Sequence, residues 1–175
     1  MIREQAYEDI RPTVILQAET WQATYKGILP DDYLHDLRLN VDLVTERVES
    51  RFGTKQNNKT LVIEEQGQLV GFSIYGPCRQ ADSEHVLEIY ALYIAKSHQG
   101  QGLGRQVVGH ILEKVRESSY SSLVIWALKD NPHRHFYRKL GGRVCDEKEI
   151  VIGGQSFLEL SYMFDDLDAL RRQVE

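Results

Sequence analysis

Glycines alternate in a short segment that joins an apolar stretch to an amphipathic one. The segment runs from Gln99 to Gly104 and reads QGQGLG. Glycine lets the main chain adopt positive φ angles and approach a ligand without a Cβ atom in the way. A helix that starts at the end of such a segment adds unpaired N–H groups and the positive end of its dipole. The spacing therefore predicts a loop that binds a phosphate group through backbone N–H groups.

The residues after the glycines exclude two familiar kinds of phosphate loop. The loop continues into Arg105 and Gln106, where a Walker A loop needs Lys followed by Ser or Thr. A dinucleotide fingerprint, G-x-G-x-x-G, needs a glycine at Arg105 or Val107 and an acidic residue about twenty positions later. The sequence has neither glycine, and no acidic residue lies between Glu117 and Asp130. The remaining pattern, Q-x-x-G-x-G, is matched.

The elements that position this loop follow from hydrophobic periodicity. Apolar and alternating runs predict strands over residues 2–6, 60–65, 68–76, 86–95, 122–128, 143–151 and 155–164. Helical spacing predicts a helix that begins near Tyr7 and stops at Gly27, further turns or helices between Pro30 and residue 48, and helices over 103–118 and 131–140. The strand–helix–strand unit at 86–128 predicts a right-handed parallel crossover beside antiparallel hairpins, and hence a mixed sheet.

Length and composition indicate one domain that spans residues 1–175. The net charge of −5 argues against general nucleic-acid binding, which needs a broad basic face. No apolar run approaches the roughly twenty residues that cross a bilayer, so no membrane partner is expected. Acidic residues near the start argue against a signal peptide, and the isolated Cys78 and Cys145 suit a cytoplasmic protein. The histidines lack ligand spacing, so no metal site is expected.

Four segments resemble the GNAT N-acetyltransferases, especially the bacterial small-molecule type, and the first three named below follow the order found in that family. They are EIYALYI from Glu88, HQGQGLG from His98, NPHRHFYRKLGG from Asn131, and WQATYKGILPDDYL from Trp21. The resemblance covers essentially the whole chain. It implies an α/β (α+β) fold, in which a GNAT-like mixed, mostly antiparallel twisted sheet of six or seven strands is flanked by helices.

The resemblance implies acetyl-CoA as co-substrate and no metal. A bulge would open the strand before the loop, pantetheine would pair with the exposed strand edge, and the loop would hold the pyrophosphate. The residues implied in cofactor binding are Leu92, Tyr93, Ile94, Gln99, Gly100, Gln101, Gly102, Leu103, Gly104, Arg105, Asn131 and Tyr137. A backbone N–H at the bulge would stabilise the oxyanion by roughly 3 kcal/mol. Asn131 also suits a helix N-cap before Pro132.

Two side chains are implied in the chemistry. Tyr137 would protonate or hydrogen-bond the departing CoA thiolate, and the alternative is an aromatic ring that only packs beneath its helix. Glu88 would help to remove the proton of an ammonium group, directly or through water. The alternative for Glu88 is that it attracts a cationic substrate or forms a surface ion pair. Gly142 stands where the family often has phenylalanine, so looser packing beneath Tyr137 is expected.

The acceptor is the weakly specified part of this interpretation. Trp21, Tyr25 and Tyr33 would overhang the acceptor site together with Glu88, although a helix face that packs on the sheet explains the same aromatics. The expected function is acetyl transfer from acetyl-CoA to a primary amine, carried by a small molecule or a peptide, by direct attack in a ternary complex. The alternatives are a non-catalytic acyl-CoA-binding regulatory module of the same fold and a nucleotide-phosphate enzyme. Homodimerisation is plausible for such a protein.

Overall fold

A seven-stranded sheet with the order β1-β2-β3-β4-β5-β7-β6 forms the centre of the computed structural model, which describes residues 1–54, 57–80 and 83–174. The strands are β1 (Ile2–Glu4), β2 (Lys59–Glu65), β3 (Gln68–Pro77), β4 (Val86–Ile94), β5 (Ser122–Leu128), β6 (Arg143–Ile152) and β7 (Gln155–Phe164). The helices are α1 (Ile10–Tyr25), α2 (Asp31–Leu39), α3 (Val41–Glu49), α4 (Leu103–Lys114), α5 (His135–Lys139) and α6 (Leu167–Val174). Short 3-10 turns η1 (Tyr7–Asp9), η2 (Lys96–His98) and η3 (Pro132–Arg134) complete the described elements.

The pairing confirms the predicted mixed, mostly antiparallel sheet. Strands β4 and β5 run parallel, and the other five neighbouring pairs run antiparallel. A parallel pair needs a long crossover, and α4 supplies it between these two strands. The predicted strands and the hairpins between them are also confirmed, within a few residues at their ends.

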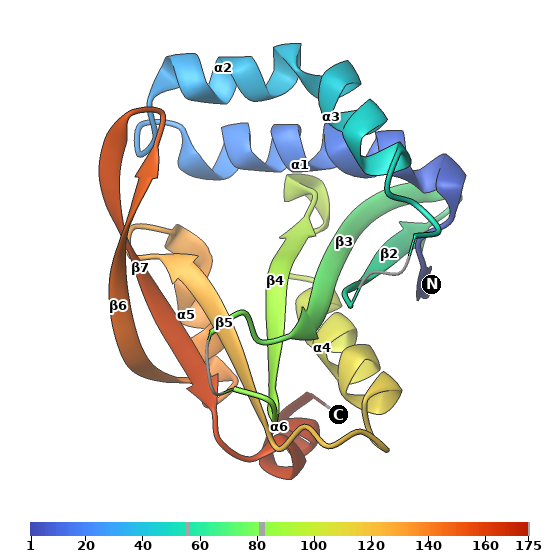
Figure 1. Cartoon of the computed structure of the whole chain (residues 1–175), viewed down its shortest axis with the longest axis vertical. Coiled ribbons are helices and arrows are strands. Elements are labelled where there is room, and N and C mark those ends of the chain that lie inside the picture. The colour runs from blue at the N-terminus through green and yellow to red at the C-terminus, as the bar shows by residue number, and fades with distance from the viewer. Residues whose placement is uncertain (55–56, 81–82, 175) are drawn as a thin grey trace.

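The parallel pair separates halfway along its length. The β4–β5 ladder begins at Val86↔Ser122 and ends at Ile89↔Ile125. On the other side of β4, the register against β3 shifts, so Ala91 pairs with Ile74 while Tyr90 has no partner. One unpaired residue of this kind is a β-bulge, which bends its strand. Figure 1 shows β4 and β5 splaying apart toward the end near α1.

Helices cover the two faces of the sheet. Leu87, Ile89 and their neighbours pack against α4, and α6 packs on the outside of α4. On the opposite face, Leu16 of α1 packs against Val62 and Phe72. A third cluster joins α1 and α2 to the β6–β7 hairpin, which rises beside them in Figure 1. The hairpin and the first two helices therefore frame the opening between β4 and β5.

The helix α6 was not predicted, although the sequence carries its signal. The Oδ1 atom of Asp166 accepts hydrogen bonds from the N–H groups of Asp168 and Ala169, as an N-cap does. Leu167 and Leu170 are both buried. A cap followed by apolar residues three positions apart predicts a helix. The helix α4, in contrast, ends at Lys114, before the predicted residue 118.

Gly142 is closely packed, so the expected loosening beneath Tyr137 is wrong. A Cβ atom on Gly142 would lie 2.8 Å from Cζ of Phe164 and 2.9 Å from the carbonyl oxygen of Tyr137. The N–H of Gly142 donates to that same carbonyl at 2.9 Å. The absence of a side chain here lets the end of α5 approach β7, and the ring of Phe164 fills the space.

Gly142→Ala is therefore expected to lower the free energy of unfolding by about 1–3 kcal/mol, because a methyl group would overlap Phe164 and the main chain. Gly109→Ala is the matched control. Gly109 lies inside α4, where its added Cβ would meet Val174 at 3.4 Å, and alanine favours helices over glycine by up to about 1 kcal/mol. Urea denaturation should show opposite signs for the two variants. A neutral Gly142→Ala would contradict the close packing.

Candidate functional site

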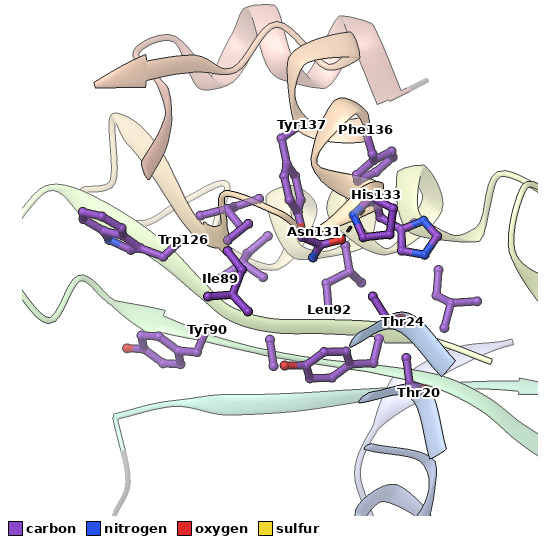
Figure 2. Close-up of a pocket in the computed structure, with 18 of the residues that line it drawn as sticks. Thr20, Thr24, Ile89, Tyr90, Leu92, Trp126, Asn131, His133, Phe136 and Tyr137 are labelled. Carbon is purple, nitrogen blue, oxygen red and sulfur yellow. Dashed lines mark hydrogen bonds between the residues drawn. The ribbon is translucent and has the colours of Figure 1, made fainter. Parts of the chain in front are cut away.

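A cavity of about 990 Å³ lies where β4 and β5 separate. Its walls come from α1, β4, the glycine loop, β5, the start of α5 and the β6–β7 hairpin. Every residue predicted for the site lines this cavity except Gln101 and Tyr33. In Figure 2, Trp126 and Tyr90 lie at one end, Thr20 and Thr24 at the other, and Asn131 between them.

The glycine loop presents a run of unpaired backbone N–H groups. Gly100 and Gly102 have φ angles of 76° and 84°, which glycine adopts without strain. The first α-helical bond runs from the N–H of Gln106 to the carbonyl of Gly102 at 3.1 Å. Among the described residues, the N–H groups of 100–105 have no hydrogen-bond acceptor. Their number and their place at the start of α4 suit an anion.

The polar side chains of the loop hold its shape. Gln99 donates through Nε2 to the carbonyl of Ile94 at 2.9 Å, and Gln101 donates to the carbonyl of Ser97 at 3.1 Å. Arg105 donates to the carbonyl of Gln173 in α6, so its guanidinium is directed along the protein surface. The loop therefore offers a ligand mainly its main chain.

One edge of β4 is open beyond the bulge. The N–H of Ala95 donates to the carbonyl of Val70 at 2.8 Å, on the β3 side. Backbone groups of successive strand residues point to opposite sides, so those of Tyr93 also face β3. Those of Leu92 and Ile94 face the side that β5 has left. The open edge thus consists of Leu92 and Ile94, while Tyr93 lines the cavity with its side chain.

Tyr137 is buried, with its ring between those of Phe136 and Tyr162. The ring centroids lie 5.5 Å and 5.3 Å away, respectively. Burial, followed by the nearby hydroxyls of Tyr93 and Tyr162, raises the pKa of Tyr137 above its ordinary value. The hydroxyl therefore keeps its proton at neutral pH and can donate a hydrogen bond. Gly104 lies close to Phe136, since a Cβ atom on it would sit 3.1 Å from the ring, and this contact sets α5 against α4.

Asn131 forms the predicted N-cap and a second hydrogen bond that the sequence does not suggest. Its Oδ1 atom accepts from the N–H of His133 at 2.8 Å, as the dashed line in Figure 2 shows. Its Nδ2 atom donates to the hydroxyl of Tyr25 at 3.0 Å, which ties the end of α1 to the start of η3. Tyr25 thus supports the cavity wall.

The other two predicted aromatics lie beside Tyr25 in different settings. Trp21 lines the cavity, with its ring centroid 5.2 Å from that of Tyr25 and 6.4 Å from that of Tyr93. Tyr33 packs against the β6–β7 turn, because a Cβ atom on Gly153 would lie 2.9 Å from the Cβ of Tyr33. Of the three aromatics predicted to bind the acceptor, Trp21 and Tyr25 line the cavity and Tyr33 does not.

Glu88 is buried, and Arg79 donates hydrogen bonds to both oxygens of its carboxylate. Its side chain is 2% exposed, whereas that of Arg79 is 63% exposed. The backbone N–H of Arg79 donates to Oε2 at 2.9 Å, and Nε and Nη2 of Arg79 donate to Oε1. This pairing raises the pKa of Arg79 further above its ordinary value, chiefly through the hydrogen bonds to Glu88. Sequence reasoning missed Arg79 because it lies in the segment between two strands, far from any motif.

Charged and aromatic residues on one face of the sheet complete the cavity. Glu88 pairs with Val124 of β5, and Glu159 of β7 pairs with Leu128 of β5. Trp126 lies between Val124 and Leu128 at alternating positions of β5, so these side chains share one face of the sheet. Lys148 of β6 pairs with Glu159 at 3.5 Å and holds its Nζ 4.0 Å from the centre of the Trp126 ring. Sequence reasoning did not select Trp126, Lys148 or Glu159. Trp126 and Glu159 each stand between apolar residues of a strand, which is a weak signal, whereas Lys148 lies between Glu147 and Glu149 and has none.

Neither a metal cluster nor a membrane span is found in the part of the chain that the structure describes. No three of its His, Cys, Asp and Glu side chains are grouped so as to hold a metal ion. None of its helices has the length and apolar character required to cross a bilayer.

Comparison with known proteins gives consistent matches. The family model described as Acetyltransferase (GNAT) family matches residues 19–142. A Bacillus subtilis (strain 168) protein, named uncharacterized N-acetyltransferase YuaI, is 28% identical over 171 residues, which are 97% of this chain and 95% of the relative. L-amino acid N-acyltransferase MnaT of Escherichia coli (strain K12) is 30% identical over 113 residues, 62% of this chain and 64% of the relative.

A solved structure shares the fold. PaiA N-acetyltransferase from Thermoplasma acidophilum, in complex with coenzyme A, superposes with a TM-score of 0.73 at 18% identity. The match covers 94% of this chain and 98% of that one.

The hydrogen bond between Tyr25 and Asn131 can be tested by removing one hydroxyl. Tyr25→Phe is expected to lower the free energy of unfolding by about 0.5–1.5 kcal/mol, because it leaves Nδ2 of Asn131 without this acceptor. Tyr33→Phe is the control, since the hydroxyl of Tyr33 has no hydrogen bond among the described residues, and its effect should stay within about 0.5 kcal/mol. Equal losses in urea denaturation would contradict a specific link.

Proposed function

This chain belongs to the GNAT acetyltransferase family, and on that premise we propose that it transfers the acetyl group of acetyl-CoA to a primary amine in a ternary complex. One observation carries the proposal: the opening between β4 and β5 has a free strand edge on one wall and a loop of unpaired N–H groups at its mouth. A chain-like ligand with an anionic end fits both features. The related fold solved with coenzyme A supports this choice of ligand.

The cofactor would bind chiefly to the main chain. The loop from Gln99 to Arg105 would take the pyrophosphate on its N–H groups, most of which have no other partner. The backbone groups of Leu92 and the N–H of Ile94 would pair with the amides of pantetheine, as a peptide pairs with a sheet edge. Asn131 would flank the pantetheine arm from the β5 side, held in place by Tyr25.

The reaction is a direct substitution at the thioester. The nitrogen of the neutral amine attacks the acetyl carbonyl carbon, the C–N bond forms, and the C–S bond breaks. An ammonium substrate must lose one proton before attack, and the attacking nitrogen loses a second proton as the amide forms. One of these protons ends on the CoA sulfur and the other goes to solvent. An N–H group at the bulge in β4 would stabilise the oxyanion.

Tyr137 would donate a hydrogen bond to the departing thiolate. A thiol titrates near pH ~8.5 and a free tyrosine near ~10, so complete proton transfer from tyrosine to the thiolate is unfavourable. The raised pKa of Tyr137 increases that difference and also keeps the hydroxyl protonated across the physiological range. Hydrogen-bond donation, with later protonation of the sulfur by solvent, satisfies both conditions.

Glu88 would accept the proton of the incoming ammonium, directly or through water. Its Oε1 atom accepts two N–H groups of the Arg79 guanidinium, and its Oε2 atom accepts one backbone N–H. A carboxylate oxygen has two lone pairs, so Oε2 keeps one acceptor position. Glu88 lines the cavity, and its side chain lies on the face of β4 opposite to that of Ile89. Trp21 would cover the acceptor from α1.

Tyr137→Phe tests the role of the hydroxyl. We expect kcat to fall roughly 10- to 100-fold, since a hydrogen bond to a charged group is lost in the transition state. The KM for acetyl-CoA should change less than about twofold, because the ring that lines the cavity is retained. Release of the CoA thiol measures both constants.

Tyr162→Phe is the matched control for Tyr137→Phe. The Tyr162 hydroxyl is buried with no hydrogen-bond partner in the described chain, although its ring touches Tyr137. Its removal should leave kcat unchanged. An unchanged kcat in Tyr137→Phe would contradict the proposed donor.

Gly102→Ala tests the phosphate loop. Alanine at the positive φ of 84° costs about 1–2 kcal/mol, so the loop is expected to relax and turn its N–H groups away. The Kd for acetyl-CoA, measured by calorimetry, should rise about tenfold. Gly154→Ala is the control, because Gly154 has a φ of 78° at the β6–β7 turn, with open space around it and outside the cavity. An equal Kd in both variants would argue against the loop as the anion site.

A further inference from the structure

The charges of the cavity are balanced in pairs. Its two described acidic side chains are Glu88 and Glu159, and each pairs with a basic side chain, Arg79 and Lys148 respectively. The remaining charged lining residues among those described are basic, and they lie near the glycine loop and α5. These described side chains leave no surplus negative charge for an acceptor with several ammonium groups. A polyamine is therefore poorly matched to this cavity.

The Arg79 guanidinium is fixed by two hydrogen bonds to Glu88 and still has N–H donors for a ligand. Nε and Nη2 bind Oε1 of Glu88, while Nη1 has no acceptor among the described residues. The guanidinium carbon lies 4.6 Å from the centre of the Tyr90 ring, and the Tyr90 hydroxyl donates to the carbonyl of Pro77. Ion pair and ring together fix the plane of the guanidinium at the cavity wall.

An Arg–Glu pair with one open edge is complementary to a small zwitterion. A carboxylate fits the Nη1 edge of Arg79, where a charge-assisted hydrogen bond is strong and directional. An amine attached to the neighbouring carbon then lies toward Glu88, which keeps one acceptor position on Oε2. The positive group of the ligand meets the negative group of the protein, and the reverse holds for its carboxylate.

We propose that the acceptor is a free α-amino acid, bound with its carboxylate on the Nη1 edge of Arg79 and its amine beside Oε2 of Glu88. The proposal rests on the acetyl transfer proposed above. It makes Arg79 a specificity-determining residue and gives its pairing with Glu88 a second purpose, which is to orient the guanidinium. A peptide N-terminus lacks this carboxylate, because the carbonyl next to its first α-carbon is a neutral amide.

The test compares acceptors that differ in one group. Thiol release from acetyl-CoA is measured with L-amino acids that have apolar, polar and acidic side chains. Each amino acid is compared with its primary amide and with the amine that remains after decarboxylation. Among the amino acids that react, we expect kcat/KM to exceed that of the matched amide and amine by at least about tenfold, the size of one charged hydrogen bond. An amide or amine that reacts as well as its amino acid would overturn the proposal and leave acetyl transfer standing.

Variants locate the preference at Arg79. The ratio of kcat/KM for the amino acid to that for its amide should fall to about one in Arg79→Gln. The same is expected in the double variant Arg79→Gln/Glu88→Gln, which leaves no buried charge unpaired. Arg79→Lys should retain part of it. Glu88→Gln should lower kcat for amino acid and amide alike, since both present the same amine. Lys129→Gln, which breaks a surface ion pair with Glu147, is the control and should keep the full preference.

The outcomes separate the two proposals. A preference that persists in Arg79→Gln contradicts the assignment of the carboxylate to Arg79. If no amine releases thiol from a protein that binds acetyl-CoA by calorimetry, the proposed acetyl transfer fails, and the acceptor proposal fails with it. The wild-type comparison decides the substrate class even where a variant does not fold.

Discussion

The separation of β4 from β5 is the constraint on which the rest of the structure depends. Parallel strands satisfy their backbone groups on each other, and after Ile89 this ladder stops inside the protein. Buried N–H and C=O groups without partners are costly, so the strands can part only where something else satisfies them. Gln99 does so for the carbonyl of Ile94, and the proposed ligand would do so for Leu92 and the N–H of Ile94. The bulge at Tyr90 makes the divergence possible by bending β4 while its pairing with β3 continues.

Contacts between side chains stabilise the walls of the opening between β4 and β5. Tyr25 reaches Asn131 across 106 positions of the chain, and the cluster of α1, α2 and the β6–β7 hairpin stabilises that span from outside. Inside, aromatic rings and the ion pair between Arg79 and the buried Glu88 line the walls. Burial raises the pKa of Tyr137, so its hydroxyl keeps the proton, while hydrogen bonds to the buried carboxylate of Glu88 set the position of the Arg79 guanidinium.

Local patterns made most of the fold predictable, together with the local structure of the proposed cofactor half of the site. The glycine loop, the strand before it and the N-cap at Asn131 are each encoded within a few residues, and all of them lie where they were predicted. Contacts between distant segments were not predictable, because nothing in the sequence near Tyr25 indicates Asn131. For the same reason, Tyr33 could not be told apart from Trp21. Gly142 was misjudged because the ring that fills its space comes from β7.

Under the proposed function, the two halves of the cavity would recognise their ligands in different ways, one through main-chain groups and the other through side chains. In the proposed complex, main-chain groups would recognise the cofactor, and many sequences can provide them once the glycines and the bulge are present. The acceptor would meet side chains from β4, from β5 and from the segment that holds Arg79. Each of these can change without disturbing the β4–β5 opening. A relative at 28% identity can therefore share the cofactor and differ in acceptor. Selectivity for the amine must be read from individual residues, and Arg79, exposed to the cavity yet fixed by a buried carboxylate, is positioned to determine it.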